Sequence, residues 1–380
     1  MLPLAEPSIG GNAAAYLAEC LDSTYVSSIG AFVDRFEREF AEAVGARFAV
    51  ACNSGTAALH LAFTALEVGP GDDVLVPTLT FVASANPVRY LGATPVLTDS
   101  EPATLNMDPG IVVDELERRA RAGQRQPRAI EVVHLVGHPA EMVPILDVAA
   151  RFGVPVIEDA SEALGAAWNS GPLAGRQVGT AGLMGCFSFN GNKLITTGGG
   201  GMVTTDDESL ARRVRHLSTQ ARLPGRAYDH DVVGFNYRLS NLASALGVAQ
   251  LEQIAELLGA RRENARAYDA AIAHLPGIDP AARASWAEPS FWLYTARLSA
   301  PDAAERDRIL DALGAARIDA RPIWTPLHRT QLYADAPRLG GAVADRLFEA
   351  ALSLPSSSTL RPADRDRVVD GLAAALTTVN

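Results

Sequence analysis

Lysine is almost absent from this sequence. Of its 33 basic residues, one is a lysine, Lys193, and the other 32 are arginines. Frequent Ala and Arg suggest a GC-rich genome, which explains why surface lysines are rare but not why one remains. An amine can lose its proton and attack a carbonyl, whereas a guanidinium stays protonated at any working pH. The alternative is that one lysine remained by chance. The residues around Lys193 distinguish this from a chemical role.

Cysteine pairs, long apolar runs and a positive net charge are missing as well. The three cysteines are widely spaced, with no CxxC pair and no metal-ligand spacing, which predicts a reducing, cytoplasmic location and no metal site. No apolar stretch reaches the roughly 18 residues of a membrane span, and the N-terminus has neither the basic start nor the apolar run of a signal peptide. The formal net charge of −11 disfavours a nucleic-acid binder.

The pattern along the chain predicts an α/β protein. A hydrophobic fraction of 48% and a charged fraction of 20% favour an ordered core. Strand-like and helix-like segments alternate through the first 210 residues, which is typical of βαβ units and a mostly parallel sheet. We expect strands at 47–53, 73–77, 94–98, 129–136 and 154–158, and helices at 54–68, 78–91 and 141–152.

Beyond residue 206 the pattern changes. Helices are expected at 208–217, 239–258 and 261–275, with a loop at 220–233, followed by a shorter α+β pattern with a strand at 291–298 and helices at 303–313 and 368–376. The prediction is a large domain of residues 1–250, built on a mostly parallel central sheet, and a smaller C-terminal α+β domain of residues 251–380. The N-terminal segment is a candidate to pack on the smaller domain.

The lone lysine lies in an unusual segment. Residues 188–201 read SFNGNKLITTGGGG, between an apolar run at 183–187 and a strand-like segment at 202–205. This predicts a tight polar turn in which a buried amine would have a lowered pKa. The glycines would let the backbone pass close to a flat ligand, although an ordinary glycine-rich hairpin is the alternative.

Two further segments fit the same chemistry. The strand in VIEDASE ends in two carboxylates, and ligands in open α/β sheets bind beyond the carboxyl ends of strands. There Asp159 could pair with a ring nitrogen or a metal, or could simply cap a helix, as could Ser161. In NSGTAA, Ser, Gly and Thr open a helix directly after a strand, which predicts a phosphate cup. A phosphate cup, a carboxylate and a lysine together are what pyridoxal 5′-phosphate needs, whereas the glycine-rich motifs of dinucleotide and P-loop sites are absent.

The motifs NSGTAAL, VPTLTFVASANPVRYLGATPVLTD, VIEDASEALGA, CFSFNGNKLITTGGGGMV and GFNYRLSNLASALG occur in this order. Over about residues 15–335 the chain thereby resembles the DegT/DnrJ/EryC1/StrS aminotransferases, fold-type I pyridoxal-phosphate enzymes that mostly act on nucleotide-linked keto-sugars. Within that family, SFNGNK with ITTGGGG, TLNMDP and YVSSIGAFVDRFE is similar to the branch that makes legionaminic-acid and bacillosamine-type amino sugars.

The resemblance implies a role for each matching residue toward the cofactor. Lys193 would attach the cofactor covalently and move the proton, and Asp159 would hold the pyridinium nitrogen. Phe81 would stack on the ring, unless it is plain core. Where many members have His or Gln, this chain has Glu162, which we also place at the cofactor. The cup would consist of Gly55, Thr56 and Ser188.

Other matches point to a partner and to the substrate. Asn236 would reach the phosphate of a neighbouring subunit, which implies a homodimer with shared sites; a helix cap is the alternative. His328 matches a substrate-side histidine, with a surface position as the alternative. Arg238 and Arg321 are candidate cations for a nucleotide diphosphate.

The reaction implied by the resemblance is transfer of an amino group, with L-glutamate as donor, to a keto-sugar or sugar-like ketone, and a nucleotide-linked acceptor is expected. Alternatives are an aminotransferase acting on an aminocyclitol or nucleoside-like intermediate, a sugar dehydratase, or a non-catalytic cofactor-binding regulator. Relatives that have become dehydratases carry histidine in place of the lysine, so Lys193 favours transamination.

Overall fold

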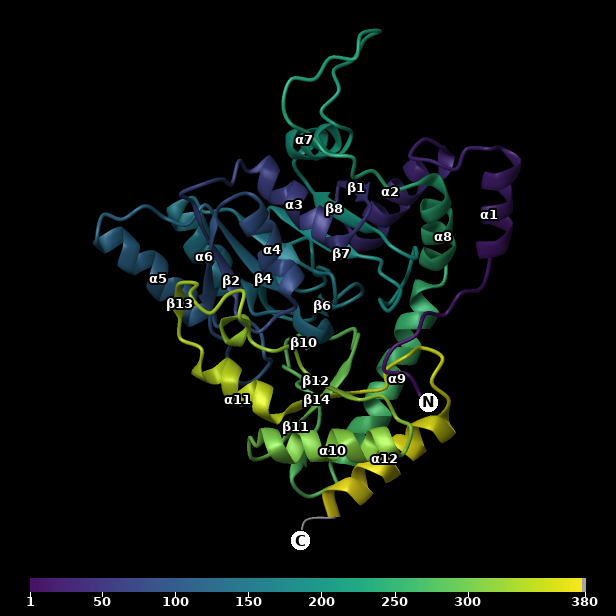
Figure 1. The fold of residues 1–380 in the computed structure, drawn as a ribbon, viewed down its shortest axis with the longest axis vertical. Coiled ribbons are helices and arrows are strands. Elements are labelled where there is room, and N and C mark those ends of the chain that lie inside the picture. The colour runs from purple at the N-terminus through teal and green to yellow at the C-terminus, as the bar shows by residue number, and fades with distance from the viewer. Residues whose placement is uncertain (378–380) are drawn as a thin grey trace.

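The computed structural model describes residues 1–377, which fold around a central eight-stranded sheet (Figure 1). Its strand order is β1-β8-β7-β5-β4-β2-β3-β13. The strands are β1 (Phe48–Cys52), β2 (Asp73–Pro77), β3 (Thr94–Thr98), β4 (Ala129–Val133), β5 (Val156–Asp159), β7 (Met184–Ser188), β8 (Gly201–Thr205) and β13 (Arg338–Leu339). Strand β8 runs antiparallel to β1 and β7, and all other neighbours are parallel, so the predicted mostly parallel sheet is confirmed.

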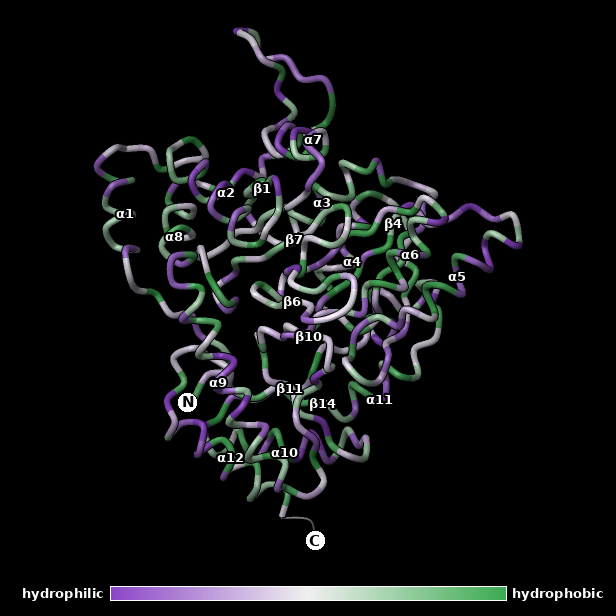
Figure 2. Tube along the Cα trace, turned by 180° about the vertical axis from the view of Figure 1, so that it is seen from behind, coloured by the Kyte–Doolittle hydropathy of each residue, from purple (hydrophilic) through white to green (hydrophobic). Residues whose placement is uncertain are grey.

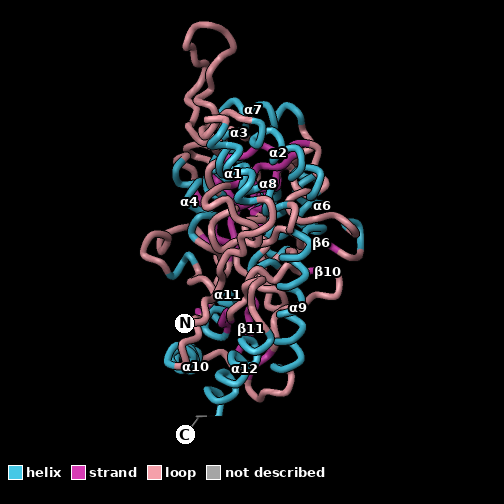
Figure 3. The backbone as a smooth tube through the Cα atoms, turned by 90° about the vertical axis from the view of Figure 1, so that its right-hand side faces the viewer, coloured by secondary structure: helices cyan, strands magenta, loops and turns pink. Residues whose placement is uncertain are grey.

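Helices cover both faces of this sheet, which Figure 3 shows edge-on. Because the strands are continuous apolar runs, both faces have to be buried. One apolar core contains side chains of α2 (Ala31–Val44), α5 (Pro109–Arg121), α6 (Met142–Phe152) and α8 (Asn241–Leu251). The other contains those of α3 (Gly55–Ala65), α4 (Val82–Tyr90) and α7 (Glu208–Ser218). In Figure 2, apolar segments gather in the region of β4. Within residues 1–377, no helix combines the length and apolarity needed to cross a bilayer.

The C-terminal part has its own sheet, in the order β12-β14-β11-β9. These strands are β12 (Arg321–Pro322), β14 (Ala351–Leu354), β11 (Tyr294–Leu298) and β9 (Ile278–Asp279), and the helices are α9 (Ile254–Ile272), α10 (Ala303–Ala315), α11 (Ala342–Ala350) and α12 (Pro362–Thr377). The N-terminus contacts this part, since Leu2 bridges to Ile318 and the Ser356 N–H donates to the Leu4 carbonyl. Because β13 joins the large sheet, the two parts share elements, and the boundary at residue 250 stays a prediction.

Several elements differ from the expected ones. The helix predicted at 239–258 ends at Leu251, and α9 begins at Ile254 instead of near residue 261. The helical pattern continues through residues 252–253, so only packing reveals the break. No helix was expected from the sequence where α1 (Ala13–Asp22), α2, α5 and α11 lie. The loop expected at 220–233 is confirmed as irregular chain, and it projects beyond α7 at the top of Figure 1.

The connectivity brings several strand ends together. Since β8 is antiparallel to both β1 and β7, these two strands run in the same direction. The carboxyl ends of β1, β2, β4, β5 and β7 therefore lie at one edge of the sheet, where open α/β sheets bind their ligands. This edge carries the segments with the predicted chemistry.

A buried histidine joins the two parts of the chain, and we expect it to make the free energy of unfolding depend on pH. The His138 Nδ1–H donates to the Pro139 carbonyl, and its Nε2 accepts from the Ala284 N–H at 3.1 Å, which requires a neutral ring. Burial lowers the pKa of His138 to about 4. The unfolded chain binds the proton near the ordinary value of about 6.5, so the free energy of unfolding should fall as the pH drops from about 6.5 to 4, by about 3 kcal/mol in total. Urea unfolding at several pH values measures this, and a His138→Gln variant should lack the titration. An equal slope in both proteins would contradict the assignment.

Candidate active site

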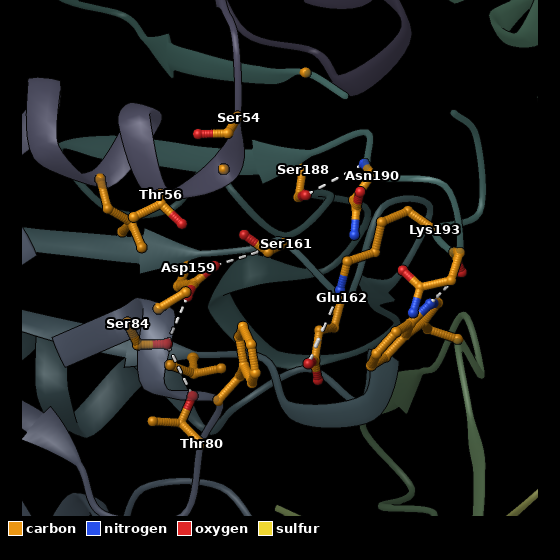
Figure 4. A pocket seen from close by; sticks show the side chains of 18 of the residues that line it. Ser54, Thr56, Thr80, Ser84, Asp159, Ser161, Glu162, Ser188, Asn190 and Lys193 are labelled. Carbon is orange, nitrogen blue, oxygen red and sulfur yellow. Dashed lines mark hydrogen bonds and ion pairs between the residues drawn. The ribbon is translucent and has the colours of Figure 1, made fainter. Parts of the chain in front are cut away.

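A cavity of about 290 Å³ opens at the carboxyl edge of the large sheet. Its walls come from segments far apart in the sequence, and Figure 4 shows the polar side chains that point into it. They include Ser54, Thr56, Thr80, Ser84, Asp159, Ser161, Glu162, Ser188, Asn190 and Lys193. Of the predicted cofactor-site residues, all but Asn236 line this cavity.

Lys193 lies in the turn between β7 and β8, as predicted. The turn is closed by a hydrogen bond from its own N–H to the Asn190 carbonyl, 3.0 Å long. Its side chain is only 14% exposed, and Nζ lies 4.0 Å from Oε1 of Glu162. Burial lowers the pKa of the Lys193 amine, while Glu162 and Asp159 oppose that shift. A neutral amine is therefore accessible at lower pH than for a solvated lysine, as a nucleophile requires.

The structure distinguishes the two carboxylates at the end of β5. Glu158 points away from the cavity. Its carboxylate is hydrogen-bonded to His134 Nε2 and accepts from the N–H groups of Gly179, Ala181 and Gly182. Asp159 faces the cavity, because successive side chains of a strand point to opposite faces. It accepts hydrogen bonds from the Ser84 hydroxyl at 2.9 Å and the Ser161 N–H at 3.0 Å, so its orientation is held while lone pairs remain for a ligand.

The predicted phosphate cup lies where β1 leads into α3. The Ser54 hydroxyl caps α3 by accepting from the Ala57 N–H, and Thr56 faces the cavity in the first turn. Glycine is required at position 55, since a Cβ there would come within 2.8 Å of the Ser188 Cβ. Free N–H groups at the start of a helix, together with hydroxyls, are groups with which proteins bind anions, so the arrangement is compatible with the predicted cup.

Removing the hydroxyls of this cup should weaken cofactor binding without unfolding the chain. In a Thr56→Ala/Ser188→Ala double variant, each lost hydrogen bond to a phosphate costs about 1.5–3 kcal/mol, so each should raise the dissociation constant by about tenfold or more. Equilibrium dialysis of the cofactor measures the effect. Thr64→Ala is the matched control, because Thr64 is on the same helix but outside the cavity lining, and its hydroxyl donates to the His60 carbonyl. Unchanged retention in the double variant would remove both residues from the site.

Aromatic rings and one buried carboxyl also line the cavity. Phe81 is half exposed, and its ring lies 5.0 Å from that of Trp324. Glu162 accepts from the Val136 N–H at 2.8 Å and from Trp324 Nε1 at 3.2 Å. Burial raises the pKa of Glu162, and Lys193 is the main group opposing this shift. The exposed ring of Phe81 excludes the plain-core alternative and leaves a face for a planar ligand.

The candidate substrate residues lie outside this cavity. His328 is buried and is not a surface residue, with Nδ1 2.7 Å from Thr78 Oγ1 and Nε2 3.1 Å from Asp345 Oδ1. Arg238 Nη1 pairs with Glu37 at 2.7 Å. Arg321 lines a second cavity of about 180 Å³, which shares Trp292 and Trp324 with the first. Their substrate roles stay predictions.

Asn236 is exposed and takes no part in its own chain's cavity. Its carbonyl accepts from Asn53 Nδ2, and it bridges to Thr219 at the base of the projecting loop. A helix cap, the alternative considered for it, belongs instead to Ser240. Contact with a second subunit's phosphate stays a prediction.

The residues of the cavity fit pyridoxal phosphate. The missing Cβ of Gly55 leaves room beside two hydroxyls for a phosphate, while Asp159 presents a carboxylate and Lys193 an amine to the same space. Sequence reasoning missed Thr80, Ser84, Trp292 and Trp324. Thr80 and Ser84 lie in the same motif as Phe81 but were given no role, whereas Trp292 and Trp324 lie outside the quoted motifs and reach the site only through tertiary packing.

Comparisons with known proteins agree with this geometry. A model of the DegT/DnrJ/EryC1/StrS aminotransferase family matches residues 7–373. A GDP-perosamine synthase of Caulobacter vibrioides is 42% identical over 376 residues, covering 99% of this chain and 98% of the relative. The putative pyridoxal phosphate-dependent aminotransferase EpsN of Bacillus subtilis is 40% identical over 380 residues, or 99% and 96% of the two chains. Among solved structures, S. venezuelae DesV in complex with a ketimine intermediate has a TM-score of 0.87 at 32% identity, covering 98% of this chain and 100% of DesV.

Proposed function

Because the chain belongs to the DegT/DnrJ/EryC1/StrS aminotransferase family, we propose that it transfers an amino group from L-glutamate to the keto group of a nucleotide-linked sugar. The family, the aminotransferase activity and the fold-type I architecture expected from the motifs are confirmed. Aminotransferases of this family depend on pyridoxal phosphate. The observation that carries the proposal is the meeting of Lys193, Asp159 and the cup of Gly55, Thr56 and Ser188 in one cavity.

Each residue then has a defined task. The cup binds the phosphate, and the Phe81 ring supports the cofactor ring. The cofactor supplies a carbonyl that receives the amino group and a ring that accepts electrons from the reacting carbon. The negative charge of Asp159 keeps a proton on the pyridine nitrogen. With the cofactor bound, the amine of Lys193 would take the proton from the carbon that bears the amino group and deliver it to the carbon of the cofactor that carried the carbonyl.

The acceptor is inferred from relatives and from the second cavity. A relative named GDP-perosamine synthase suggests a GDP-linked sugar as the first acceptor to test. Arg321 lines the cavity that adjoins the Lys193 cavity and pairs there with Asp319 at 3.1 Å, so an anionic group of such a substrate would compete with Asp319 for its guanidinium. The presence of lysine rather than histidine at position 193 supports transamination over dehydration.

A homodimer is part of the proposal. Asn236 is exposed at the base of the projecting loop, so its side chain is available to a second copy rather than to its own cavity. The apolar side chains of Tyr228 and Val233 are also exposed in this loop, at 83% and 85%. Both features support a subunit contact here.

Spectroscopy and product analysis test the function. The purified enzyme should show a visible band from the attached cofactor, and L-glutamate should bleach it. A nucleotide-linked keto-sugar should then restore the band and yield an amino sugar, identified by mass spectrometry. Lys193→Arg is the inactive control. Bleaching followed by product only from ketones without a nucleotide would overturn the acceptor assignment, and no response to any amino acid would overturn the aminotransferase.

A further inference from the structure

The amine of Lys193 contacts an aromatic ring from the other part of the chain. Its Nζ lies 3.6 Å from the centroid of the Trp292 ring, well within the about 6 Å limit of a cation–π contact. Trp292 precedes β11, so the contact joins the large sheet to the C-terminal part. No other cation within residues 1–377 lies over this ring.

Trp292 is anchored from two sides. Its indole N–H donates to the carbonyl of Asn192, the residue before the lysine, at 2.7 Å. Its own carbonyl accepts a hydrogen bond from the buried guanidinium of Arg261 on α9. The Trp324 ring stacks beside it, with centroids 6.3 Å apart and planes 23° apart. Because the residue is buried and both its indole N–H and its backbone carbonyl are hydrogen-bonded, its ring can fix the position of the amine.

We propose that Trp292 is a positioning residue, whose ring holds the ammonium group of Lys193 whenever the lysine is not attached to the cofactor. Transamination has such a stage, because the cofactor leaves the lysine when it takes up the amino group. A lysine side chain that is free at its end has several rotatable bonds and would otherwise sample many rotamers. The ring keeps Nζ beside Glu162 and within the cavity, ready for the return step.

The charges around Lys193 cannot supply the same effect by themselves. Glu162 lies at 4.0 Å and Asp159 also favours the protonated amine, whereas Arg261 opposes it. Both carboxylates act on the amine through their charge, whereas the Trp292 ring contacts it directly, with Nζ 3.6 Å from the ring centroid. The ring favours the ammonium form only through the negative potential of its face, and that potential can be changed without changing shape.

Fluorinated tryptophan isolates this contribution. The full chain is produced with fluorotryptophan at all four tryptophans and studied without cofactor, so the result does not depend on the proposed function. Fluorine withdraws electron density from the ring face, so the pKa of Lys193 should fall by about 0.3–1 unit. The pKa is read from the pH dependence of trace acetylation at the single lysine, measured by peptide mass spectrometry. Thermal unfolding checks that the fold is kept.

A Trp292→Phe variant is the matched background. It keeps an aromatic ring that fluorotryptophan cannot modify, while the other tryptophans are still fluorinated. The shift caused by fluorination should therefore disappear in this background. The proposal is overturned if fluorination leaves the pKa unchanged in the otherwise unaltered chain, or if an equal shift persists in Trp292→Phe.

Discussion

Replacement of Lys193 by arginine should abolish transamination even though it keeps the positive charge. The guanidinium stays protonated and cannot form the covalent link or move a proton. Loss of a positioned proton-transfer group alone lowers the rate by about 10²–10⁴-fold, and loss of the link should add to this. Single-turnover absorbance with L-glutamate measures the change, and Lys193→Ala should be equally inactive.

Borohydride reduction locates the link directly. Reduction of the resting enzyme should fix the cofactor to the peptide that contains Lys193, since the only other amine is the N-terminal one at the exposed Met1. Arg38→Lys is the control, because it adds a second lysine at an exposed site. Label on the N-terminus, or activity in Lys193→Arg, would refute the covalent role.

Replacement of Asp159 by asparagine should leave the cofactor bound but reduce turnover by about 10²–10³-fold, the usual cost of removing one preorganised electrostatic contact. The side chain keeps its shape, and Ser84 can reverse its hydroxyl to accept from the new amide, because Thr80 Oγ1 lies 2.8 Å away as an alternative partner. The charge that keeps the ring nitrogen protonated is lost. Steady-state kcat and cofactor titration separate these two effects.

Ser84→Ala is the matched control for this prediction. It removes one hydrogen bond to Asp159 but keeps the negative charge, so its effect on kcat should be much smaller. If Asp159→Asn turned over at nearly the normal rate, Asp159 would act only through its hydrogen bond from the Ser161 N–H, as a local turn residue.

Local chemistry made much of this site predictable. Lys193 stood out because the other 32 basic residues are arginines, and Asp159 because it ends an apolar strand. Thr56 lies in a pattern of small polar residues between a strand and a helix. The positions of Asp159 and Thr56 can be predicted because each depends on a strand end or a helix start within a few residues of the chain.

The aromatic wall could not be predicted in this way. Trp292 and Trp324 lie far from the lysine in sequence, in an α+β region with no motif, and both reach the cavity only because the C-terminal part packs against the large sheet. The break between α8 and α9 was missed for a related reason, since the helical pattern runs through it without interruption.

The sequence by itself determined the family and the mostly parallel sheet, and it singled out Lys193 as the candidate to bind the cofactor, since these depend on residue type and spacing along one segment. Tertiary structure decided which of Glu158 and Asp159 faces the cavity. The Glu158 carboxylate is occupied by hydrogen bonds with His134 and three backbone N–H groups, whereas Asp159 faces the cavity. It also placed the Trp292 ring against the amine of Lys193 and buried His328 between Thr78 and Asp345. Contacts between distant segments arise from packing, which no single stretch of sequence encodes.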